Sequence, residues 1–192
     1  MKKIQLWIGD ELSDEYTLVD DEDYDMILEA PRSYTKAGKL RKRSGKWRLH
    51  CLTPNLKYGA TYSGPYAHSG KGSNGCYVHR LVMGSPEGMD IDHINGNGLD
   101  NRKENLRACT RSQNAMNKKL RSDSTTGYKG VYKIKSSTNK NPYRASIGLP
   151  GDRGKNKKSL GYFPTAWEAA RAYNEAATRL FGEYAYLNKI KE

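Results

Sequence analysis

The residues between Val78 and Lys119 constrain the fold of this chain more than any other stretch. A short alternation of apolar and acidic residues ends at Asp92 and His93 and predicts a strand. The Gly- and Asn-rich run NGNGLDN follows and suits tight turns. A second short strand, 106–109, leads into a helix whose start is indicated by a T-x-x-Q capping box beginning at Thr110. The predicted order is therefore strand, loop, strand, helix.

This order of elements, and the residues at four polar positions within it, resemble the motif of the HNH nuclease family, which has a ββα-metal fold. The resemblance implies that Asp92 ligates a divalent metal and that His93 acts as the general base. It also implies that Asn105 braces the loop and orients the histidine. Asn114, on the helix, stands at the second metal-ligand position, and Asn at that position is the form found in homing endonucleases.

These residue types suit phosphodiester hydrolysis. A neutral imidazole can take a proton from water near pH 7, because its unperturbed pKa is about 6.5. One Asp and one Asn offer two oxygen ligands, which suits Mg²⁺ or Mn²⁺, with water and substrate phosphate completing the shell. Neighbouring residues on a strand point to opposite faces. Asp92 and His93 can therefore share a site only if the strand ends or bends there.

The alternative interpretation makes His93 a structural histidine and Asp92 a turn residue. It leaves Asn105 and Asn114 at the family spacing unexplained. His79 also invites a ligand interpretation, but we expect it to be packed or hydrogen-bonded within the fold.

The charge of the chain is high and uneven. The 192 residues carry a net charge of +12, whereas residues 1–30 hold two lysines and ten acidic residues, a net −8 that leaves +20 on the remainder. Such a basic body predicts a nucleic-acid partner. We expect the acidic run to fold as a solvated face on the basic body. The alternative is a DNA mimic that covers the binding surface.

Other sequence features exclude several classes of protein. No apolar run approaches the length of a membrane span, and we expect a cytoplasmic protein of a bacterial or phage-infected cell. The three cysteines include no C-x-x-C pair, so we expect reduced thiols and no structural zinc. We also expect no small-molecule cofactor.

The predicted fold is α+β, in four parts. Residues 1–77 form a small antiparallel β element that contacts DNA, with 63–75 as a loop. Residues 78–119 form the nuclease core, 120–127 a linker, and 128–192 a three-stranded antiparallel sheet with one helix. The strands are expected at 128–135, 143–148 and 159–163. The helix is expected to begin at the T-x-x-E capping box of Thr165 and to end at Gly182.

The C-terminal part resembles the plant ethylene-response-factor (Apetala-two) DNA-binding domain. The segments that carry the resemblance are GYKGVYKIK, YRASIG and the stretch from SLGYF to AYLN. That resemblance implies that the sheet lies in the major groove of DNA. Ile134, Gly148 and Ser159 differ from the plant residues at the corresponding contact positions, so the plant target sequence cannot be carried over.

We expect DNA contacts from basic and polar side chains in three places. In the N-terminal part they are Arg41, Lys42, Arg43, Lys46 and Arg48, and on the nuclease helix Arg111 and Lys118. In the C-terminal part they are Lys129, Tyr132, Lys133, Arg144, Ser146, Lys157 and Lys158.

The sequence thus predicts a metal-dependent, homing-type endonuclease that acts on double-stranded DNA. One active site per chain predicts a monomer that nicks one strand and leaves a 5′ phosphate and a 3′ hydroxyl. The alternative is a non-catalytic, sequence-specific regulator that retains the nuclease fold. Cleavage of RNA is disfavoured, because a sheet that reads a major groove does not suit the deep, narrow groove of RNA.

Overall fold

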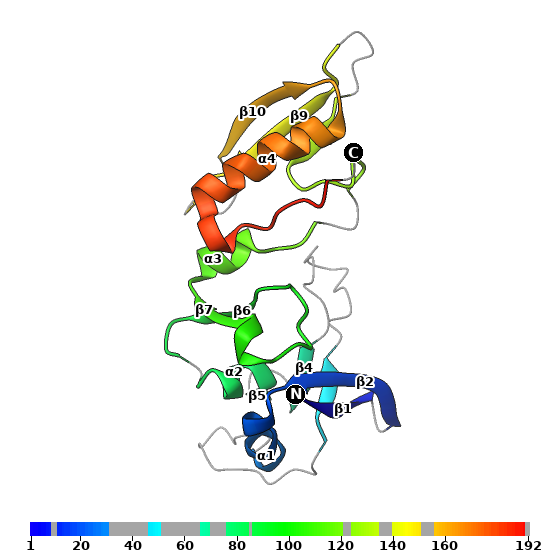
Figure 1. Cartoon of the computed structure of the whole chain (residues 1–192), viewed down its shortest axis with the longest axis vertical. Helices are drawn as coiled ribbons and strands as arrows, with labels where there is room; N and C mark the ends of the chain where they lie inside the picture. The colour runs from blue at the N-terminus through cyan, green and yellow to red at the C-terminus, as the bar shows by residue number, and fades with distance from the viewer. Residues whose placement is uncertain are drawn as a thin grey trace. The chain divides into compact units, whose positions relative to one another are not determined.

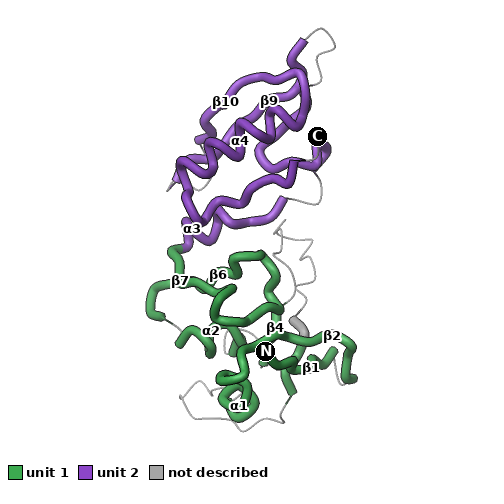
Figure 2. The backbone as a smooth tube through the Cα atoms, viewed as in Figure 1, with its two compact units in different colours: residues 1–110 green, residues 111–192 purple. Residues whose placement is uncertain are grey.

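The computed structural model describes residues 1–8, 11–30, 46–50, 66–69, 76–84, 86–120, 124–134, 140–150 and 156–190 (Figure 1). The chain forms two compact units, residues 1–110 and 111–192 (Figure 2). The architecture is α+β, as predicted. The boundary falls inside the stretch 78–119, so the predicted nuclease core is shared between the two units.

A five-stranded sheet forms the base of the first unit. Its strands are β1 (Lys2–Ile8), β2 (Glu11–Val19), β3 (Arg48–His50), β4 (Tyr66–Ser69) and β5 (Cys76–Tyr77), in the order β2-β1-β3-β4-β5. Only the β1–β3 pair is parallel among these described strands. Strand β4 lies inside the segment that we expected to be a loop, so that expectation is wrong for 66–69. Helix α1 (Asp21–Glu29) follows β2, and the short helix α2 (Val78–Val82) follows β5.

One hydrophobic core joins the N-terminal strands to the nuclease motif. Leu6, Ile27 and Trp47 are almost completely buried, and they belong to the same cluster as Ile91 and Leu106. The Trp47 indole also donates a hydrogen bond of 3.2 Å to the carbonyl of Ile27 at the end of α1. The N-terminal residues therefore pack against the apolar side of the two strands β6 (Asp90–His93) and β7 (Leu106–Cys109) and help to support them.

The strand–strand–helix order of the central stretch is present along the chain. Strand β6 (Asp90–His93) pairs antiparallel with β7 (Leu106–Cys109), and a 3₁₀ turn, η2 (Lys103–Asn105), precedes β7. Helix α3 (Arg111–Met116) begins where the sequence predicted a helix. It belongs to the second unit.

The second unit is a three-stranded antiparallel sheet covered by one helix. Strands β8 (Val131–Lys133), β9 (Tyr143–Gly148) and β10 (Lys157–Phe163) lie in the order β10-β9-β8, and α4 (Ala166–Phe181) packs across them (Figure 1). The alanines of α4 let the helix approach closely; Ala170 and Ala177 are fully buried against the sheet. The turn η3 (Gly182–Tyr184) follows α4.

The ends of α4 confirm the sequence-based prediction. The Thr165 hydroxyl accepts a hydrogen bond from the backbone N–H of Glu168, and the Glu168 carboxylate accepts one from the backbone N–H of Thr165. The helix ends at Gly182, which has a φ of +54°. Both signals are local, which is why the sequence alone located them.

Candidate active site

Asp92 and His93 are the last two residues of strand β6. Asp92 and His93 are 6% and 5% exposed. Directly after His93 the chain turns, with the N–H of Gly96 donating to the His93 carbonyl at 2.8 Å and Gly96 at a φ of +66°. Both residues nevertheless pair in the β6–β7 ladder, Asp92 with Arg107 and His93 with Leu106, so a site shared by the two side chains stays a prediction.

A salt bridge across the β6–β7 ladder holds the Asp92 carboxylate. Asp92 lies opposite Arg107 in the register, and the guanidinium donates from Nε at 3.0 Å and from Nη2 at 2.8 Å, both to Oδ2. Arg107 is itself largely buried. The pair therefore fixes the orientation of the carboxylate, because both charges are shielded from water.

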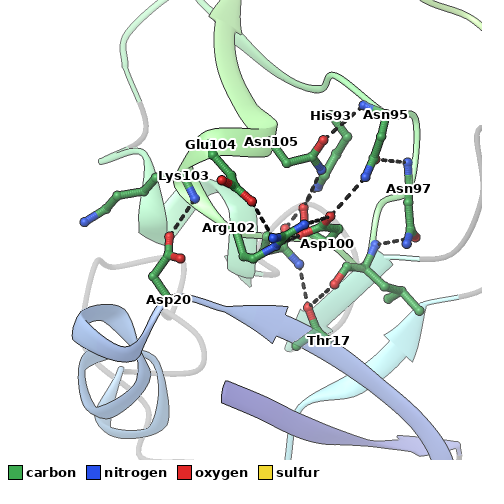
Figure 3. A network of polar contacts seen from close by, with 12 residues as sticks. Thr17, Asp20, His93, Asn95, Asn97, Asp100, Arg102, Lys103, Glu104 and Asn105 are labelled. Carbon is green, nitrogen blue, oxygen red and sulfur yellow. Dashed lines mark hydrogen bonds and ion pairs between the residues drawn. The ribbon is translucent and has the colours of Figure 1, made fainter. Parts of the chain in front are cut away.

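The His93 imidazole is held by Asn101 and, through it, by β2. Nε2 of His93 lies 3.0 Å from Oδ1 of Asn101, and Nδ2 of Asn101 donates to the Thr17 hydroxyl at 2.6 Å. Thr17 lies on β2 beside the loop that follows β6 (Figure 3). Neither Thr17 nor Asn101 is among the site residues predicted from the sequence. No local pattern signals a contact between positions 84 residues apart.

Burial sets the protonation of the imidazole. It lowers the pKa of His93, while the bond to Asn101 and the negative charges of Asp92 and Asp100 partly oppose that shift. A lowered pKa keeps the ring neutral at pH 7, which is the form that can accept a proton.

Asn105 braces the loop between β6 and β7. Its Oδ1 accepts from the backbone N–H of Asn95 at 3.0 Å, and its Nδ2 donates to the carbonyl of Asp100 at 2.7 Å (Figure 3). Arg102 adds a salt bridge to Asp100, 2.8 Å from Nε to Oδ1. These bonds tie the two ends of the loop together, so the loop has a defined shape beside His93.

Aromatic rings surround the imidazole. The rings of Tyr66 and His79 lie 5.8 Å and 5.1 Å from that of His93, and Tyr77 stacks on His79 at 5.3 Å. Burial lowers the pKa of His79 to about 3, with smaller contributions from the charges of His93 and Arg80. His79 is therefore a buried, neutral histidine that packs against the rings of Tyr77 and His93.

Acidic residues of the N-terminal part contact Lys103, in the segment between β6 and β7. Asp20 stands at the N-cap position of α1, but its carboxylate accepts from the backbone N–H of Lys103 at 2.8 Å instead of capping the helix. The Lys103 ammonium pairs with Glu22 and lies 3.1 Å from Asp23. Three carboxylates of the acidic run therefore contact Lys103, and both interpretations of the run stay open.

Asn114 lies on α3 in the second unit and is half-buried. The carbonyls at the end of α3 are bound by a lysine of the same unit. The Lys129 ammonium donates to the carbonyls of Met116 at 2.8 Å and Lys118 at 2.7 Å. Burial, and then the charge of Lys118, lower the pKa of Lys129 to about 8. The amine that we expected on DNA thus closes the end of the helix that carries Asn114.

The other residues predicted to contact DNA fall into three groups. Arg41, Lys42 and Arg43 lie outside the described residues. In the first unit, Lys46 lies over the Trp7 ring, with Nζ 3.7 Å from the centroid, and Arg48 is half-buried on β3. In the second unit, Ser146 is buried, and the exposed members are Arg111, Lys118, Tyr132, Lys133, Arg144, Lys157 and Lys158.

The exposed face of the second sheet combines aromatic and basic groups. Tyr132, Arg144 and Tyr162 lie in one cross-strand row, because Arg144 pairs with both tyrosines in the register. The Lys157 ammonium donates to the Tyr132 hydroxyl at 3.1 Å. Such a row can contact phosphates and stack against planar groups.

The two oxygen donors predicted from the sequence, Asp92 and Asn114, are of the kind that suits one hard cation. Among the described residues no group of three or more His, Cys, Asp or Glu side chains could hold a metal. One carboxylate and one amide oxygen fit an ion that keeps water ligands and recruits phosphate, as Mg²⁺ does. Cys76 and Cys109 carry free thiols.

The strand–strand–helix order, with an Asp-His pair at the end of its first strand, defines a nuclease-like motif. Residues 76–116 match the family model for HNH endonucleases. No solved structure matches the chain. Within the described residues, no helix is both long and apolar enough to cross a bilayer.

Two curated relatives carry the same family name. "Uncharacterized HNH endonuclease L560" of Acanthamoeba polyphaga mimivirus is 40% identical over 116 residues, which cover 59% of this chain and 56% of the relative. The "SPbeta prophage-derived putative HNH homing endonuclease YosQ" of Bacillus subtilis (strain 168) is 36% identical over 96 residues, 47% of this chain and 53% of the relative. The chain thus spans about half the length of the relatives that it matches.

Proposed function

We propose that this protein is a DNA endonuclease that hydrolyses phosphodiester bonds with His93 as general base. The observation that carries the proposal is the buried imidazole at the end of β6, which is held at Nε2 by Asn101 and follows the buried Asp92 in the chain. The match of residues 76–116 to the HNH endonuclease family gives this geometry its chemical context.

In the proposed reaction, His93 takes a proton from a water molecule, whose oxygen attacks the phosphorus. The bond to the 3′ oxygen breaks, and that oxygen is protonated from solvent, which leaves a 3′ hydroxyl and a 5′ phosphate. Asp92 and Asn114 would hold the divalent cation, Mg²⁺ or Mn²⁺. When bound, the cation stabilises negative charge on the phosphate and the leaving oxygen. Arg107 keeps the Asp92 carboxylate oriented, and Asn105 keeps the loop beside His93 in shape.

We propose a homing-type enzyme that nicks one strand as a monomer. One His93 per chain supports one cut for each binding event, and one of the two relatives carries the words "homing endonuclease" in its name. A linear product from a plasmid with one site would instead indicate paired active sites.

The second unit is proposed as the DNA-binding part. Its exposed sheet carries the row Tyr132–Arg144–Tyr162 with Lys133, Lys157 and Lys158 nearby. The resemblance to the Apetala-two domain supports binding of this sheet to double-stranded DNA. Ser146 is buried, so we expect its contribution to be to the sheet and not to DNA.

Incubation of supercoiled plasmid with the protein in Mg²⁺, Mn²⁺ or EDTA tests the proposal. We expect open-circle product that needs the metal ion and that DNA ligase reseals, because ligase requires a 5′ phosphate beside a 3′ hydroxyl. Tight, salt-sensitive binding without cleavage of any plasmid would favour the regulator instead.

A further inference from the structure

A chain of hydrogen bonds leads from the proposed base to the backbone. The Thr17 hydroxyl donates to the carbonyl of Leu99 at 2.8 Å and accepts from Nδ2 of Asn101 at 2.6 Å. Oδ1 of Asn101 then faces Nε2 of His93 at 3.0 Å. Thr17 and Asn101 are both 0% exposed, so water does not compete for these bonds.

The carbonyl at the end of the chain sets the direction of every bond in it. A carbonyl can only accept, and that of Leu99 accepts both the Thr17 hydroxyl and the backbone N–H of Leu18, the latter at 2.8 Å. The single hydroxyl proton of Thr17 is therefore committed to Leu99. Thr17 must then accept from Asn101, which places the amide nitrogen of Asn101 toward Thr17 and its oxygen toward His93.

The opposite orientation of the Asn101 amide is the alternative that the contacts disfavour. Rotation would turn Oδ1 toward Thr17, which would have to withdraw its proton from the Leu99 carbonyl, 2.8 Å away. It would also exchange the weak contact of Nδ2 with the Gly98 carbonyl, at 3.5 Å, for a contact between two acceptors. Two unfavourable oxygen pairs would replace two hydrogen bonds.

We propose that Asn101 and Thr17 are positioning residues that fix the tautomer of His93. An amide oxygen facing Nε2 requires the proton on Nε2, which places the lone pair of the neutral ring on Nδ1. Nδ1 is then the atom that takes the proton from water. The resulting imidazolium retains its Nε2–H bond to Asn101. Thr17 of β2, outside the matched 76–116 segment, thereby acts through Asn101 to select which nitrogen is the base.

The role of Nδ1 as the base rests on the proposed function, whereas the tautomer of His93 can be measured without DNA. Long-range ¹⁵N–¹H correlation spectra of the full chain, labelled at histidine, distinguish a protonated nitrogen from an unprotonated one. The His93 signals are assigned by their loss in His93→Gln. Near neutral pH we expect a protonated Nε2 and an unprotonated Nδ1 at His93. The reverse pattern would overturn the proposal, whether or not the protein cleaves DNA.

Substitutions at Thr17 separate this role from general stability. Thr17→Val keeps the shape and removes the hydroxyl, so we expect a mixture of tautomers and a roughly tenfold lower kcat with unchanged DNA affinity. Thr17→Ser should restore both properties. Ser13→Ala is the matched control, since Ser13 lies on the same strand and its hydroxyl donates to the Leu6 carbonyl at 2.8 Å outside the chain of bonds. It should leave the tautomer and kcat as they are.

The outcomes distinguish the two proposals. If Thr17→Val keeps a single Nε2–H tautomer, Thr17 does not fix the ring and the inference is wrong. If the tautomer behaves as expected and no variant cleaves DNA, the proposed function fails while the hydrogen-bond assignment stands.

Discussion

Arg107 and Asp92 form the charged pair on which the site depends. Removing one partner of a buried pair leaves an uncompensated charge and typically costs roughly 3 to 5 kcal/mol. We expect Arg107→Met to lower the free energy of unfolding by about 3 kcal/mol in the presence of EDTA, measured by urea denaturation. Excess Mg²⁺ should recover part of this loss, because a cation on Asp92 replaces the lost charge. Equal losses with and without Mg²⁺ would argue against Asp92 as a ligand.

His79 should make stability depend on pH. Its folded-state pKa of about 3 lies below the ordinary value of 6.5, so the unfolded chain binds the proton more readily. The contribution of neutral His79 to the free energy of unfolding is therefore complete above pH 6.5. It is lost as the pH falls toward 3, and the free energy of unfolding decreases by about 1.4 kcal/mol per pH unit in that range.

Comparison with His79→Gln isolates this contribution. The difference in unfolding free energy between wild type and variant should shrink as the pH falls from 6.5 to 4.5. A constant difference across that range would mean that His79 does not titrate as its burial requires.

At the level of elements, local signals were readable from the sequence and distant ones were not. Strand β9 coincides with the predicted 143–148, and α4 begins and ends at its predicted caps. Strand β8 is shorter among the described residues than the prediction, and β10 begins two residues earlier, at Lys157. Strand β4 was missed because its Gly- and Ser-rich flanks are typical of loops.

In the candidate site, too, local features could be predicted from the sequence, whereas contacts between distant residues could not. The resemblance to the HNH family indicated Asp92, His93, Asn105 and Asn114, and their roles stay predictions. Asn101 and Thr17 could not be found, because their contact depends on β2 lying against the loop after β6. The backbone bonds that bring them together, from Leu18 N–H to the Leu99 carbonyl and from Asn101 N–H to the Leu18 carbonyl, join distant parts of the chain.

Gly130 fixes how closely α4 approaches the turn before β8. It has a φ of +77°, and a Cβ there would lie 2.2 Å from the Tyr173 ring and 2.7 Å from the Ser146 carbonyl. We expect Gly130→Ala to destabilise the second unit by about 2 kcal/mol or more. Gly127→Ala is the matched control, with a φ of +73° and nothing within 4 Å of its Cβ. The stabilities of the two full-length variants are compared by calorimetry. If both lose the same stability, backbone strain explains the whole effect, and the clash of the new Cβ with Tyr173 and Ser146 does not.

At the scale of the whole molecule, the second unit carries one of the two proposed metal ligands. Helix α3 has six residues, too few for a stable isolated helix. Lys129 binds the carbonyls at its end. We therefore expect the second unit to be required for the geometry of Asn114, in addition to its proposed binding of DNA.

Lys129→Met tests this dependence by removing the ammonium and keeping the stem. We expect faster amide exchange in residues 111–118 and a higher Mg²⁺ concentration for half-maximal nicking. Amides of β6 and β7 should exchange at the wild-type rate. Lys189→Met, which changes an exposed lysine of the same unit that is not among the predicted DNA contacts, serves as the control. Unchanged exchange in α3 would show that Lys129 does not hold the helix.

The most direct test of the central claim compares wild-type protein with His93→Ala on the same supercoiled plasmid, with DNA binding measured in parallel. The account predicts metal-dependent nicking by the wild type and a loss of at least about a hundredfold in the variant, with binding nearly unchanged, since a general base contributes about 10² to 10⁴ in rate. Nicking by His93→Ala at the wild-type rate would contradict it, because the chemistry would then belong to another site.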